Sequence, residues 1–294
     1  MADPLTCYKY CSGAAALRCL SEGTAYFASP RGLNDSLEAT FDVAGPEQYA
    51  AVIEKTLSEL SLRRGGPPFA VDDRAAEDIR VASTEETERF VSACQQVGIF
   101  SGAPRPDNQP MWADYCGNEQ GVCFHLEWSK DIIETYHLFP TEVVYSRETR
   151  LLNRADDVRQ ALLEVAKQNP TWSLDQLKAF SLSEPFLRRV GIRGVARAVS
   201  IKHADWEHER EVRMLAPRSG PLPLMQNILK SVIYTRTDFP EWGSIVMLLH
   251  QLYPKVRHAK MAFSHREPFV TSQLLTTKKV PFEVDPDPWW RPAK

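Results

Sequence analysis

The stretch WEHEREVRML, residues 206–215, carries three glutamates and two arginines before it turns apolar. Read as a β-strand, whose side chains alternate between two faces, it places Glu209, Glu211 and Arg213 together on one face. The opposite face then carries Arg210, Val212 and Met214, and its apolar pair favours burial of that face. We therefore predict a half-buried strand whose carboxylates face a cleft.

Two carboxylates at positions i and i+2 of a strand lie about 7 Å apart. One can raise the pKa of the other, and Arg213 is expected to be the counter-charge that keeps both ionised. Such a pair suits divided roles, in which one carboxylate stabilises a developing cation and the other takes a proton from an attacking group. The alternative is a solvent-facing edge strand blunted by its charges.

The composition is that of a soluble globular protein: 294 residues, 43% apolar and 25% charged. The formal charge of −3 offers no basic patch for nucleic acid. No apolar run is long enough to cross a bilayer, and the first residues lack the pattern of a secretory leader. Six scattered cysteines and seven histidines show no metal-ligand spacing. We expect a cytoplasmic protein with reduced thiols, no metal and no membrane contact, although a chain exported by a specialised route would look the same.

The order of the predicted elements is that of an α+β fold. Strands are expected at 6–10, 24–29, 97–101, 121–127, 141–146, 209–216, 230–236 and 257–263, and helices at 13–23 (closed by Gly23), 46–63, 84–95 and 240–253. Residues 154–190 are helical in pattern, with breaks at Pro170 and Pro185. We predict a single domain over 1–280, with a helical insert at about 154–190, and a loose Pro-rich tail at 281–294.

Two further strands carry residues suited to a ligand site. Tyr8, Lys9 and Tyr10 place two phenols on one strand face and an ammonium on the other. A core tyrosine pair with a surface lysine would show the same pattern. Ser101 ends its strand beside small residues that let a ligand approach the backbone.

Two loops or turns add to this set. SPRGLNDSLE, residues 29–38, follows a strand, and its polar side chains, Asn34 among them, can fix a ligand or cap a helix. Trp112 and Tyr115 are three residues apart and share a face of a helical turn. Aromatic side chains in that arrangement can stack on a flat ring or fill a core.

Taken in order, these clusters resemble a bacterial family of unknown function, DUF2971. The shared pattern runs YKY, FASPRGLNDSLE, GIFS, MWADYCGNEQGVCF and K-x3-W-x2-E-x-E-V-R, and the last motif begins at Lys202 and includes Trp206. The resemblance covers Tyr8 to about Arg236, less clearly over 147–195. The combination of motifs is specific, whereas each motif alone is not.

The sequence departs from the family pattern in two places. Ser36 replaces a proline that commonly follows N-D. Gly102 and Ala103 stand where the family commonly carries a second serine, so this strand offers one hydroxyl rather than a pair. Within the last motif, we expect Trp206 to be a core residue beneath the strand. Lys202 can be a second phosphate ligand or a surface lysine, and we expect the surface.

The motif order of the family resembles that of ADP-ribosyltransferases, which carry a basic or aromatic residue on an early strand, a serine strand in the middle and a glutamate, often in E-x-E, near the end. That resemblance implies a mixed or antiparallel β core with flanking helices and a helical insert. It also implies an enzyme of the glycosyltransferase class that uses NAD as a substrate and has an acceptor of unknown kind: a protein, a nucleic acid or a small molecule.

The same resemblance implies roles for individual residues. Glu211 would hold the nicotinamide-ribose hydroxyl and stabilise the oxocarbenium-like transition state, Glu209 would activate the acceptor, and Ser101 would support the catalytic carboxylate. The roles of the two glutamates are interchangeable at this point. The NAD site would be lined by Tyr8, Lys9, Tyr10, Arg31, Asn34, Trp112 and Tyr115.

Within that lining, Lys9 or Arg31 would bind the pyrophosphate, and Trp112 or Tyr115 would stack on the nicotinamide. The helical insert would influence acceptor choice. A toxin, a phage-defence protein and a housekeeping enzyme of this class would share all of these motifs.

Two other functions fit the sequence. The same cleft can belong to a non-catalytic module that binds a nucleotide or a protein, and the altered serine strand favours this alternative. The charged strand can also be structural, with the function elsewhere. Glu211 exposed and far from Tyr8 would favour the binding module over the enzyme.

Overall fold

The structure, a computed structural model, describes residues 5–33, 42–43, 48–147, 151–152, 154–263 and 268–272. The chain divides into two compact units, each assembled from separate stretches of sequence. Unit 1 consists of Met1–Leu33, Gly98–Tyr145 and Lys202–Lys294, and unit 2 of Asn34–Val97 and Ser146–Ile201. The sequence predicts one domain with an insert at about 154–190; those helices lie in unit 2 together with helices from 34–97.

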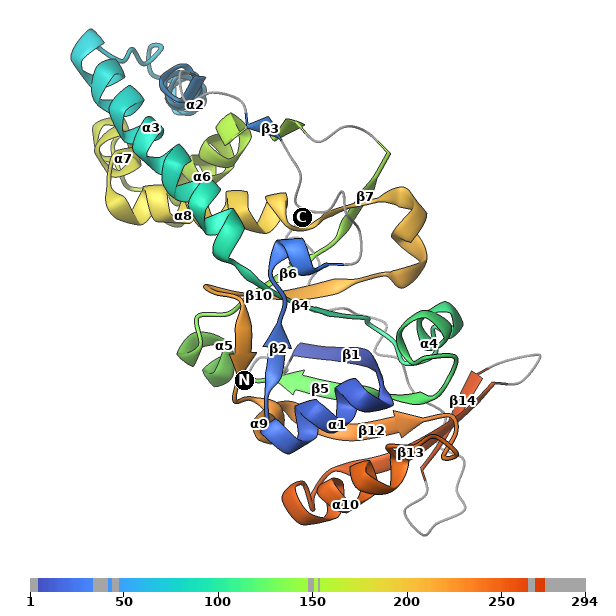
Figure 1. The fold of residues 1–294 in the computed structure, drawn as a ribbon. Helices are drawn as coiled ribbons and strands as arrows, with labels where there is room; N and C mark the ends of the chain where they lie inside the picture. Colours follow the sequence, from blue (N-terminus) through green and yellow to red (C-terminus); the bar gives the residue numbers. More distant parts are fainter. Residues whose placement is uncertain are drawn as a thin grey trace. The chain divides into compact units, whose positions relative to one another are not determined.

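Within the described residues, the principal sheet of unit 1 has five strands in the order β1-β5-β12-β13-β14 (Figure 1). They are β1 Leu5–Ser12, β5 Gly121–Trp128, β12 Leu229–Tyr234, β13 Arg257–Phe263 and β14 Pro268–Ser272. Every neighbouring pair is antiparallel except β12 and β13, which are parallel and are joined through the helix α10, Trp242–Leu252. A mixed sheet with flanking helices confirms the predicted α+β class.

A second sheet of unit 1 brings the early and late motifs together. Its strands are β4 Gly98–Gly102, β10 Val212–Ala216 and β6 Phe139–Glu142, with β10 antiparallel to both neighbours. Tyr8 and Ala103 exchange two backbone hydrogen bonds of 2.8 Å, which tie the end of β4 to β1. On the other side of β4, Ser101 lies opposite Arg213 of β10. The first strand of the chain therefore lies one strand away from the E-x-E motif.

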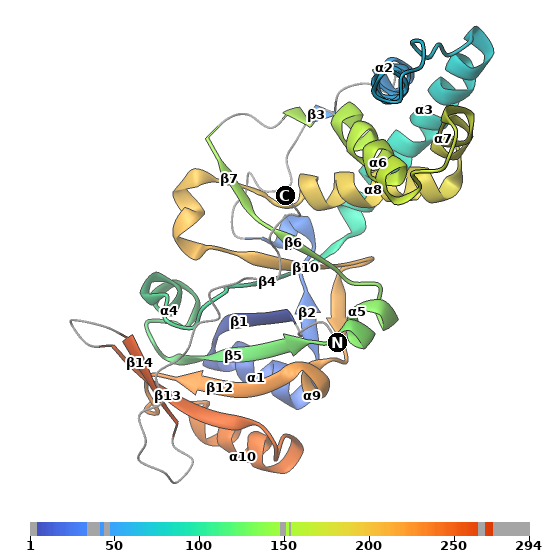
Figure 2. The same ribbon diagram turned by 180° about the vertical axis from the view of Figure 1, so that it is seen from behind.

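The remaining elements of unit 1 are short strands and helices. The strands β2 Ala25–Phe27 and β11 Gly220–Leu222 pair, and the strands β7 Val144–Ser146 and β9 Ile201–His203 each have one residue, Ser146 and Ile201, that is assigned to unit 2. The helices are α1 Gly13–Glu22, α4 Gln109–Tyr115, α5 Lys130–Thr135 and α9 Met225–Ile228, with 3-10 turns η1 Pro30–Gly32 and η2 Ala204–Glu209. Figures 1 and 2 show α1 and α10 side by side against the principal sheet.

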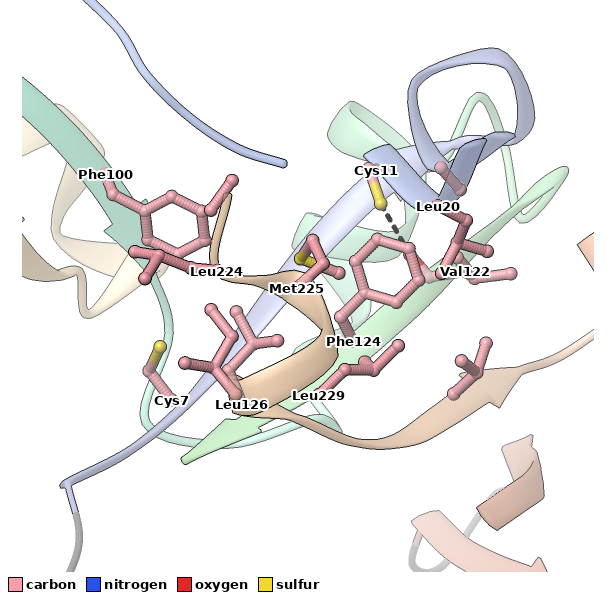
Figure 3. Packing of buried hydrophobic residues seen from close by; sticks show 14 of the residues in the cluster. Cys7, Cys11, Leu20, Phe100, Val122, Phe124, Leu126, Leu224, Met225 and Leu229 are labelled. Atoms are coloured by element: carbon pink, nitrogen blue, oxygen red, sulfur yellow. Dashed lines mark hydrogen bonds between the residues drawn. The ribbon is translucent and has the colours of Figure 1, made fainter. Parts of the chain in front are cut away.

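Alternation along β1 separates two apolar clusters on the two faces of the principal sheet. Cys7 and Cys11 pack with the buried side chains of α1, α9 and α10, the cluster shown in part in Figure 3. Tyr8 and Tyr10 point to the other face and pack against Trp112 of α4. The site described below borders β1 and α4.

Both ends of helix α1 are capped by the residues that the sequence places there. The Ser12 hydroxyl accepts a hydrogen bond from the Ala15 amide, which satisfies one otherwise unpaired donor at the N-terminus. At the other end Gly23 adopts the left-handed conformation, with φ of 66°, and its amide donates to the Cys19 carbonyl. Ala16 and Leu20, four residues apart, form the buried face. The predicted helix over 13–23 is confirmed.

Unit 2 is a helical assembly with its own apolar core. Its elements are α2 Gln48–Arg63, α3 Asp73–Gln96, α6 Arg154–Gln168, α7 Leu174–Ser181 and α8 Glu184–Ala198, with a parallel strand pair β3 Asp42–Val43 and β8 Leu151–Leu152. The core draws on α2, α3, α6, α7 and α8. Pro170 lies between α6 and α7, and Pro185 lies in the first turn of α8, so both predicted interruptions are confirmed.

Unit 2 also buries an ionic network. Arg154 is fully buried; its guanidinium donates to Glu86 at 2.6 Å, lies 3.3 Å from Asp157 and covers the ring of Phe90 at 3.8 Å. Removing one partner of such a pair leaves a buried charge uncompensated. We interpret this network as structural, because the arginine that holds it together is fully enclosed.

The prediction of a strand over 209–216 is wrong at its beginning. Residues 204–209 form η2, Arg210 has left-handed φ and ψ of 47° and 50°, and β10 starts at Val212. The reason is physical: a strand extended back to 209 would turn the Arg210 guanidinium toward the apolar side chains of β10. The left-handed turn leaves Arg210 exposed instead.

Two other boundaries differ. The predicted strand over 141–146 is divided into β6, which ends at Glu142, and β7, which begins at Val144. The helix predicted over 84–95 begins earlier, as α3 from Asp73. Its charged first half gives a weak apolar signal but is supported by local pairs such as Arg80 with Glu77, 2.6 Å apart.

Some predictions concern residues that the structure does not describe. Asn34 and the rest of the polar loop to Glu38, like the Pro-rich tail at 281–294, lie outside the described residues. Among the helices that are described, none combines the length and the apolar character needed to cross a membrane.

Candidate functional site

Two glutamates converge because the chain turns between them. Glu209 ends η2, and the amide of Arg210 donates to the Glu207 carbonyl at 3.2 Å, which closes the turn. The left-handed Arg210 then sends Glu211 back in the same direction as Glu209. Both glutamates are buried, with 1% and 6% of their surface exposed, so the turn delivers two carboxylates into the protein.

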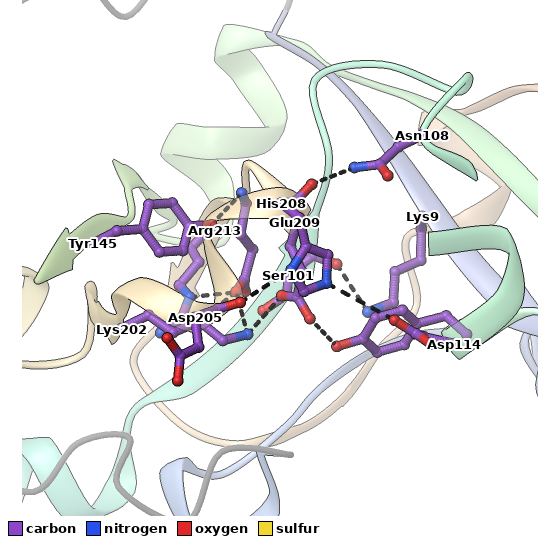
Figure 4. A network of polar contacts seen from close by, with 12 residues as sticks. Lys9, Ser101, Asn108, Asp114, Tyr145, Lys202, Asp205, His208, Glu209 and Arg213 are labelled. Atoms are coloured by element: carbon purple, nitrogen blue, oxygen red, sulfur yellow. Dashed lines mark hydrogen bonds and ion pairs between the residues drawn. The ribbon is translucent and has the colours of Figure 1, made fainter. Parts of the chain in front are cut away.

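Lys202 joins the two carboxylates. Its ammonium donates to Glu209 Oε2 at 2.6 Å and to Glu211 Oε2 at 3.2 Å (Figure 4). The same ammonium lies 4.8 Å from the ring centroid of Trp206, a distance suited to a cation–π contact. Lys202 is 3% exposed, so the expectation of a surface lysine is wrong. Trp206 is half-buried, so it is not the core residue that the sequence predicts.

Arg213 pairs with Glu211 in a two-point contact. Its Nε and one terminal nitrogen donate to the two carboxylate oxygens at 2.9 Å each. Planar guanidinium and carboxylate groups match in this arrangement, which holds the carboxylate at one angle. The Glu211 amide donates to the Tyr145 hydroxyl at 2.8 Å, which fixes the backbone as well. Arg213 is therefore the counter-charge of Glu211, as predicted, but the cation paired with Glu209 is Lys202.

Glu209 has a different second partner. The Tyr115 hydroxyl of α4 donates to Glu209 Oε1 at 2.5 Å. All four carboxylate oxygens of the pair therefore have partners within unit 1: a phenol and an ammonium for Glu209, and a guanidinium and the shared ammonium for Glu211. Two carboxylates and two cations make this cluster electrically balanced. We call Lys202, Glu209, Glu211 and Arg213 the carboxylate cluster.

Ser101 and Lys9 border the carboxylate cluster on the side of β4 and β1. The Lys9 ammonium donates to the Ser101 carbonyl at 2.8 Å and lies 5.2 Å from the ring centroid of Phe100. The Ser101 hydroxyl is buried and has no hydrogen-bond partner of good geometry in the described part of the chain. It lies close enough to Glu211 to act on that carboxyl electrostatically. Ser101 therefore offers a hydroxyl at the edge of the cluster.

The electrostatics of the cluster follow from its burial. Burial raises the pKa of Glu211 above the ordinary glutamate value, and Lys202 and the Ser101 hydroxyl offset only part of that rise. For Lys202 burial acts to lower the pKa, but Glu211 and Glu209 outweigh it, so the pKa is raised. Burial also raises the pKa of the Tyr145 hydroxyl to about 12. The ammonium is thus protonated, and the buried Glu211 carboxyl takes up a proton more readily than an ordinary glutamate does.

The tyrosines of β1 are packed rather than open. Tyr8 is 4% exposed and stacks on His125, with ring centroids 5.0 Å apart. Tyr10 is 3% exposed, donates to the Arg105 carbonyl at 2.8 Å and accepts from the Asn108 amide at 3.2 Å. Tyr10 therefore holds the loop after β4 in place. It can shape the site through that loop.

Of the two aromatic residues in α4, only Tyr115 reaches the cluster. Trp112 is fully buried, and its indole nitrogen donates to the Pro106 carbonyl at 2.8 Å, so its ring is committed to the core. Arg31 is exposed on η1 and contacts none of the cluster residues in the described contacts. The structure thus brings Tyr8, Lys9, Tyr10, Ser101, Tyr115, Glu209 and Glu211 into one region, with Tyr8 and Tyr10 as packing residues.

A depression of about 430 Å³ opens beside Glu209. One wall is the loop and first turn over 103–110, and the other is formed by His208 and Arg210, the two neighbours of Glu209. The Asn108 side-chain amide donates to the His208 carbonyl at 2.6 Å and ties the walls together. A ligand in this depression would lie on the outer side of the turn that carries the two glutamates.

Three participants could not be assigned from sequence. Lys202 and Glu209 are seven residues apart, but a strand end and a 3-10 turn lie between them, so no single periodicity aligns them. Tyr145 and Asn108 reach the site from separate segments, through a backbone amide and a backbone carbonyl, so residue type gives no signal. The K-x3-W spacing in the motif was the available hint for Lys202.

The donor set does not suit a metal ion. Among the described residues, no three His, Cys, Asp or Glu side chains group as metal ligands would. The two glutamates already face an ammonium and a guanidinium, which occupy the positions that a cation would take. All six cysteines are free thiols.

The family model described as "Protein of unknown function (DUF2971)" matches residues 111–214. This confirms the resemblance to that family over the segment that contains Tyr115, Lys202 and both glutamates. The first-strand residues and Ser101 precede the matched segment. No curated protein and no solved structure matches the chain.

Proposed function

We propose that this protein, whose residues 111–214 match the DUF2971 family model, is an ADP-ribosyltransferase-like enzyme that cleaves the nicotinamide–ribose bond of NAD. ADP-ribose would pass to an acceptor, or to water in a glycohydrolase. One observation carries the proposal: two glutamates from one short motif are held together by Lys202, beside Ser101 and next to the first strand.

The chemistry needs a fixed negative charge. When the bond between C1′ of the ribose and the nicotinamide nitrogen breaks, its electron pair leaves with nicotinamide and C1′ becomes oxocarbenium-like. Glu211 is suited to stabilise that cation, because Arg213 and the Tyr145 hydroxyl fix its position before the reaction. A preorganised carboxylate in a dry site is worth far more than one in water.

Glu209 is suited to the second role. The acceptor forms a bond to C1′ and must lose a proton, and Glu209 can take it after exchanging its contact with the Tyr115 hydroxyl. With water as the acceptor the products are nicotinamide, ADP-ribose and a proton. The two glutamates differ in their partners, which supports a division of roles along these lines.

Access is the demanding part of this proposal. Each carboxylate oxygen already has a protein partner, so a ribose hydroxyl reaches Glu211 by using a second lone pair of an oxygen or by displacing Lys202. Lys202 is the more easily displaced partner, because its 3.2 Å contact is the longest of the set. We expect NAD binding to shift Lys202 toward Glu209.

Nicotinamide release from NAD by the purified full-length protein tests the proposal. Glu211→Gln keeps the shape of the side chain and removes its charge, so release should fall by about 10²–10³-fold. Glu207→Gln is the matched control, since Glu207 is exposed on η2 and should leave release unchanged. Thermal melting of each variant shows whether the fold is kept.

The alternative is a non-catalytic module that binds a nucleotide or a protein. Two features favour it: the complete pairing of both carboxylates, and Gly102 and Ala103 in place of a second serine. Calorimetric binding of NAD without nicotinamide release, with or without candidate acceptors, would support this alternative. Neither binding nor release would contradict both nucleotide-based functions.

A further inference from the structure

The depression beside Glu209 has an unusual residue in its wall. Arg210 is one of only a few non-glycine residues with positive φ in the described chain, at 47°, a conformation that disfavours residues with a Cβ. Its neighbours Glu209 and Glu211 both point into the carboxylate cluster, so the turn directs the Arg210 side chain outward. The backbone is thus held in a strained region, and Arg210 lines the depression.

The Arg210 guanidinium is also uncommitted. Arg210 is exposed, and within the described residues no carboxylate or carbonyl pairs with its side chain. Two other surface arginines of unit 1 are paired, Arg105 with Asp107 and Arg236 with Asp238, whereas the exposed Arg18 and Arg31 have, like Arg210, no such pair within the described residues. Because Arg210 is held on a strained turn and has no such partner, its donors are available to a ligand.

The depression as a whole favours an anion. Arg105 and Asp107 both line it and neutralise each other through a two-point ion pair, which leaves Arg210 as the uncompensated charge. His208 and Asn108 add polar side chains on either side, and the Asp114 carboxylate lies 3.9 Å from His208. A guanidinium that is free to use its fork of donors matches a phosphate group in two-point geometry.

The sequence assigned phosphate binding to Lys9 or Arg31, and neither is well placed for it. The Lys9 ammonium is bonded to the Ser101 carbonyl. Arg31 contacts no member of the carboxylate cluster in the described contacts. By contrast, Arg210 stands between the two glutamates in the chain, so a phosphate held there lies on the other side of the turn from the proposed ribose site.

We propose that the depression lined by Arg105, Asn108, His208 and Arg210 binds the phosphate groups of the ligand, with Arg210 as the principal contact. In the context of the proposed function, on which this assignment rests, the phosphates are the pyrophosphate of NAD. Glu209 and Glu211 would then face the ribose, and Arg210 between them would face the pyrophosphate.

Calorimetric titration of the full-length protein with inorganic pyrophosphate, at low ionic strength, tests the site directly. Arg210→Gly removes the guanidinium and suits the positive φ, so this variant should fold and should melt at a higher temperature than the wild type. Its affinity for pyrophosphate should fall about tenfold or more. Arg210→Lys keeps the charge without the planar fork and should bind with intermediate affinity.

Arg18→Gln is the matched control, because Arg18 is exposed on α1 and its removal changes the net charge by the same amount as Arg210→Gly. Unchanged pyrophosphate affinity in Arg210→Gly would overturn the proposal, as would a wild-type protein that binds no pyrophosphate at millimolar concentration. An equal loss in Arg18→Gln would also overturn it, since the effect would then come from net charge.

The same variants separate this inference from the proposed function. If NAD is cleaved, Arg210→Gly should raise KM for NAD about tenfold and leave kcat within a factor of a few, because the phosphates are remote from the bond that breaks. Pyrophosphate binding that depends on Arg210 in a protein that cleaves no NAD would uphold the anion site and contradict the proposed function alone. Cleavage with no change in KM would contradict the anion site alone.

Discussion

At the scale of single residues, Lys202 decides how the carboxylate cluster is held together. Its ammonium is the shared partner of Glu209 and Glu211, and all three groups are almost fully buried. Burial of charges is costly in itself, so such a cluster adds little net stability when intact. Removing one member of the cluster is destabilising, because an unpaired charge then remains inside the protein.

Lys202→Met should therefore destabilise the protein by about 3–5 kcal/mol, since both glutamates lose their common cation. Urea unfolding followed by circular dichroism measures this loss. Adding Glu209→Gln to Lys202→Met should recover part of it, because one buried charge is then removed.

Lys130→Met provides the matched control. Lys130 is an exposed lysine in α5, with 77% of its side chain accessible, whose ion pair with Glu134 lies at the surface. Its replacement should change the unfolding free energy by no more than about 0.5 kcal/mol. Equal effects of the two lysine substitutions would mean that Lys202 is not buried among its partners as described.

At the scale of elements, close approach of strands requires glycine at the start of β4. A Cβ placed on Gly98 would lie 2.4 Å from the Arg218 carbonyl oxygen and 2.8 Å from Phe27 Cβ, and backbone cannot move away cheaply. Gly98→Ala should cost about 1–3 kcal/mol in the free energy of unfolding. Urea unfolding measures this cost. Because Ser101 lies in the same strand as Gly98, the affinity for NAD or pyrophosphate, measured by calorimetry, should change as well.

Gly243→Ala is the opposite case. Gly243 lies in α10, and a Cβ there meets nothing within 4 Å. Alanine should stabilise the protein by about 0.5–1 kcal/mol, because it favours the helix more than glycine does. Destabilisation by Gly243→Ala, or tolerance of Gly98→Ala, would contradict the packing of these two elements.

Elements with strong local signals could be predicted from the sequence. The caps of α1, the alternation in β1 and β5, and the apolar α10 are all encoded within their own residues, and each forms as expected. The turn at Arg210 could not be predicted, because it depends on Lys202 and on the tyrosines that bind the two glutamates. The convergence of the glutamates was thus correctly expected, but on an incorrect strand geometry.

At the scale of the whole molecule, sequence gave no sign that residues 34–97 and 146–201 associate. Helices α2 and α6 pack together although about a hundred residues separate them along the chain, as Arg159 and Glu59 illustrate with a 3.0 Å ion pair. The pattern of an amphipathic helix predicts that one face is buried, but it does not predict which element covers that face. The division into two discontinuous units is therefore a property of tertiary packing.

Stability at alkaline pH should reflect the buried thiols of both units. Burial raises the pKa of Cys7 to about 11 and those of Cys94 and Cys116 to about 12, from an ordinary value of 9.0. Because the pKa values are raised in the folded state, the protonated thiols contribute fully to the free energy of unfolding below pH 9. Between pH 9 and 11 or 12 only the unfolded chain releases these protons, so this contribution is lost as the pH rises. Each thiol should steepen the fall by about 1.4 kcal/mol per pH unit.

Cys116→Ala tests this dependence. Between pH 9 and 11 the fall in unfolding free energy should become shallower by about 1.4 kcal/mol per pH unit relative to the wild type, whatever the change at neutral pH. Unfolding in urea under a phosphine reductant, at a series of pH values, gives the slope. An unchanged slope would mean that the Cys116 thiol is accessible in the folded protein.

The discontinuous arrangement of the two units has a consequence for synthesis on the ribosome. Strand β1 is made first, yet β12, which continues its sheet beyond β5, ends only at Tyr234, and the glutamates on which the proposed site depends follow residue 201. Every segment of unit 2 has been translated by Ile201. The helical unit can therefore complete its core while the principal sheet holds only β1 and β5, before β12, β13 and β14 have been made.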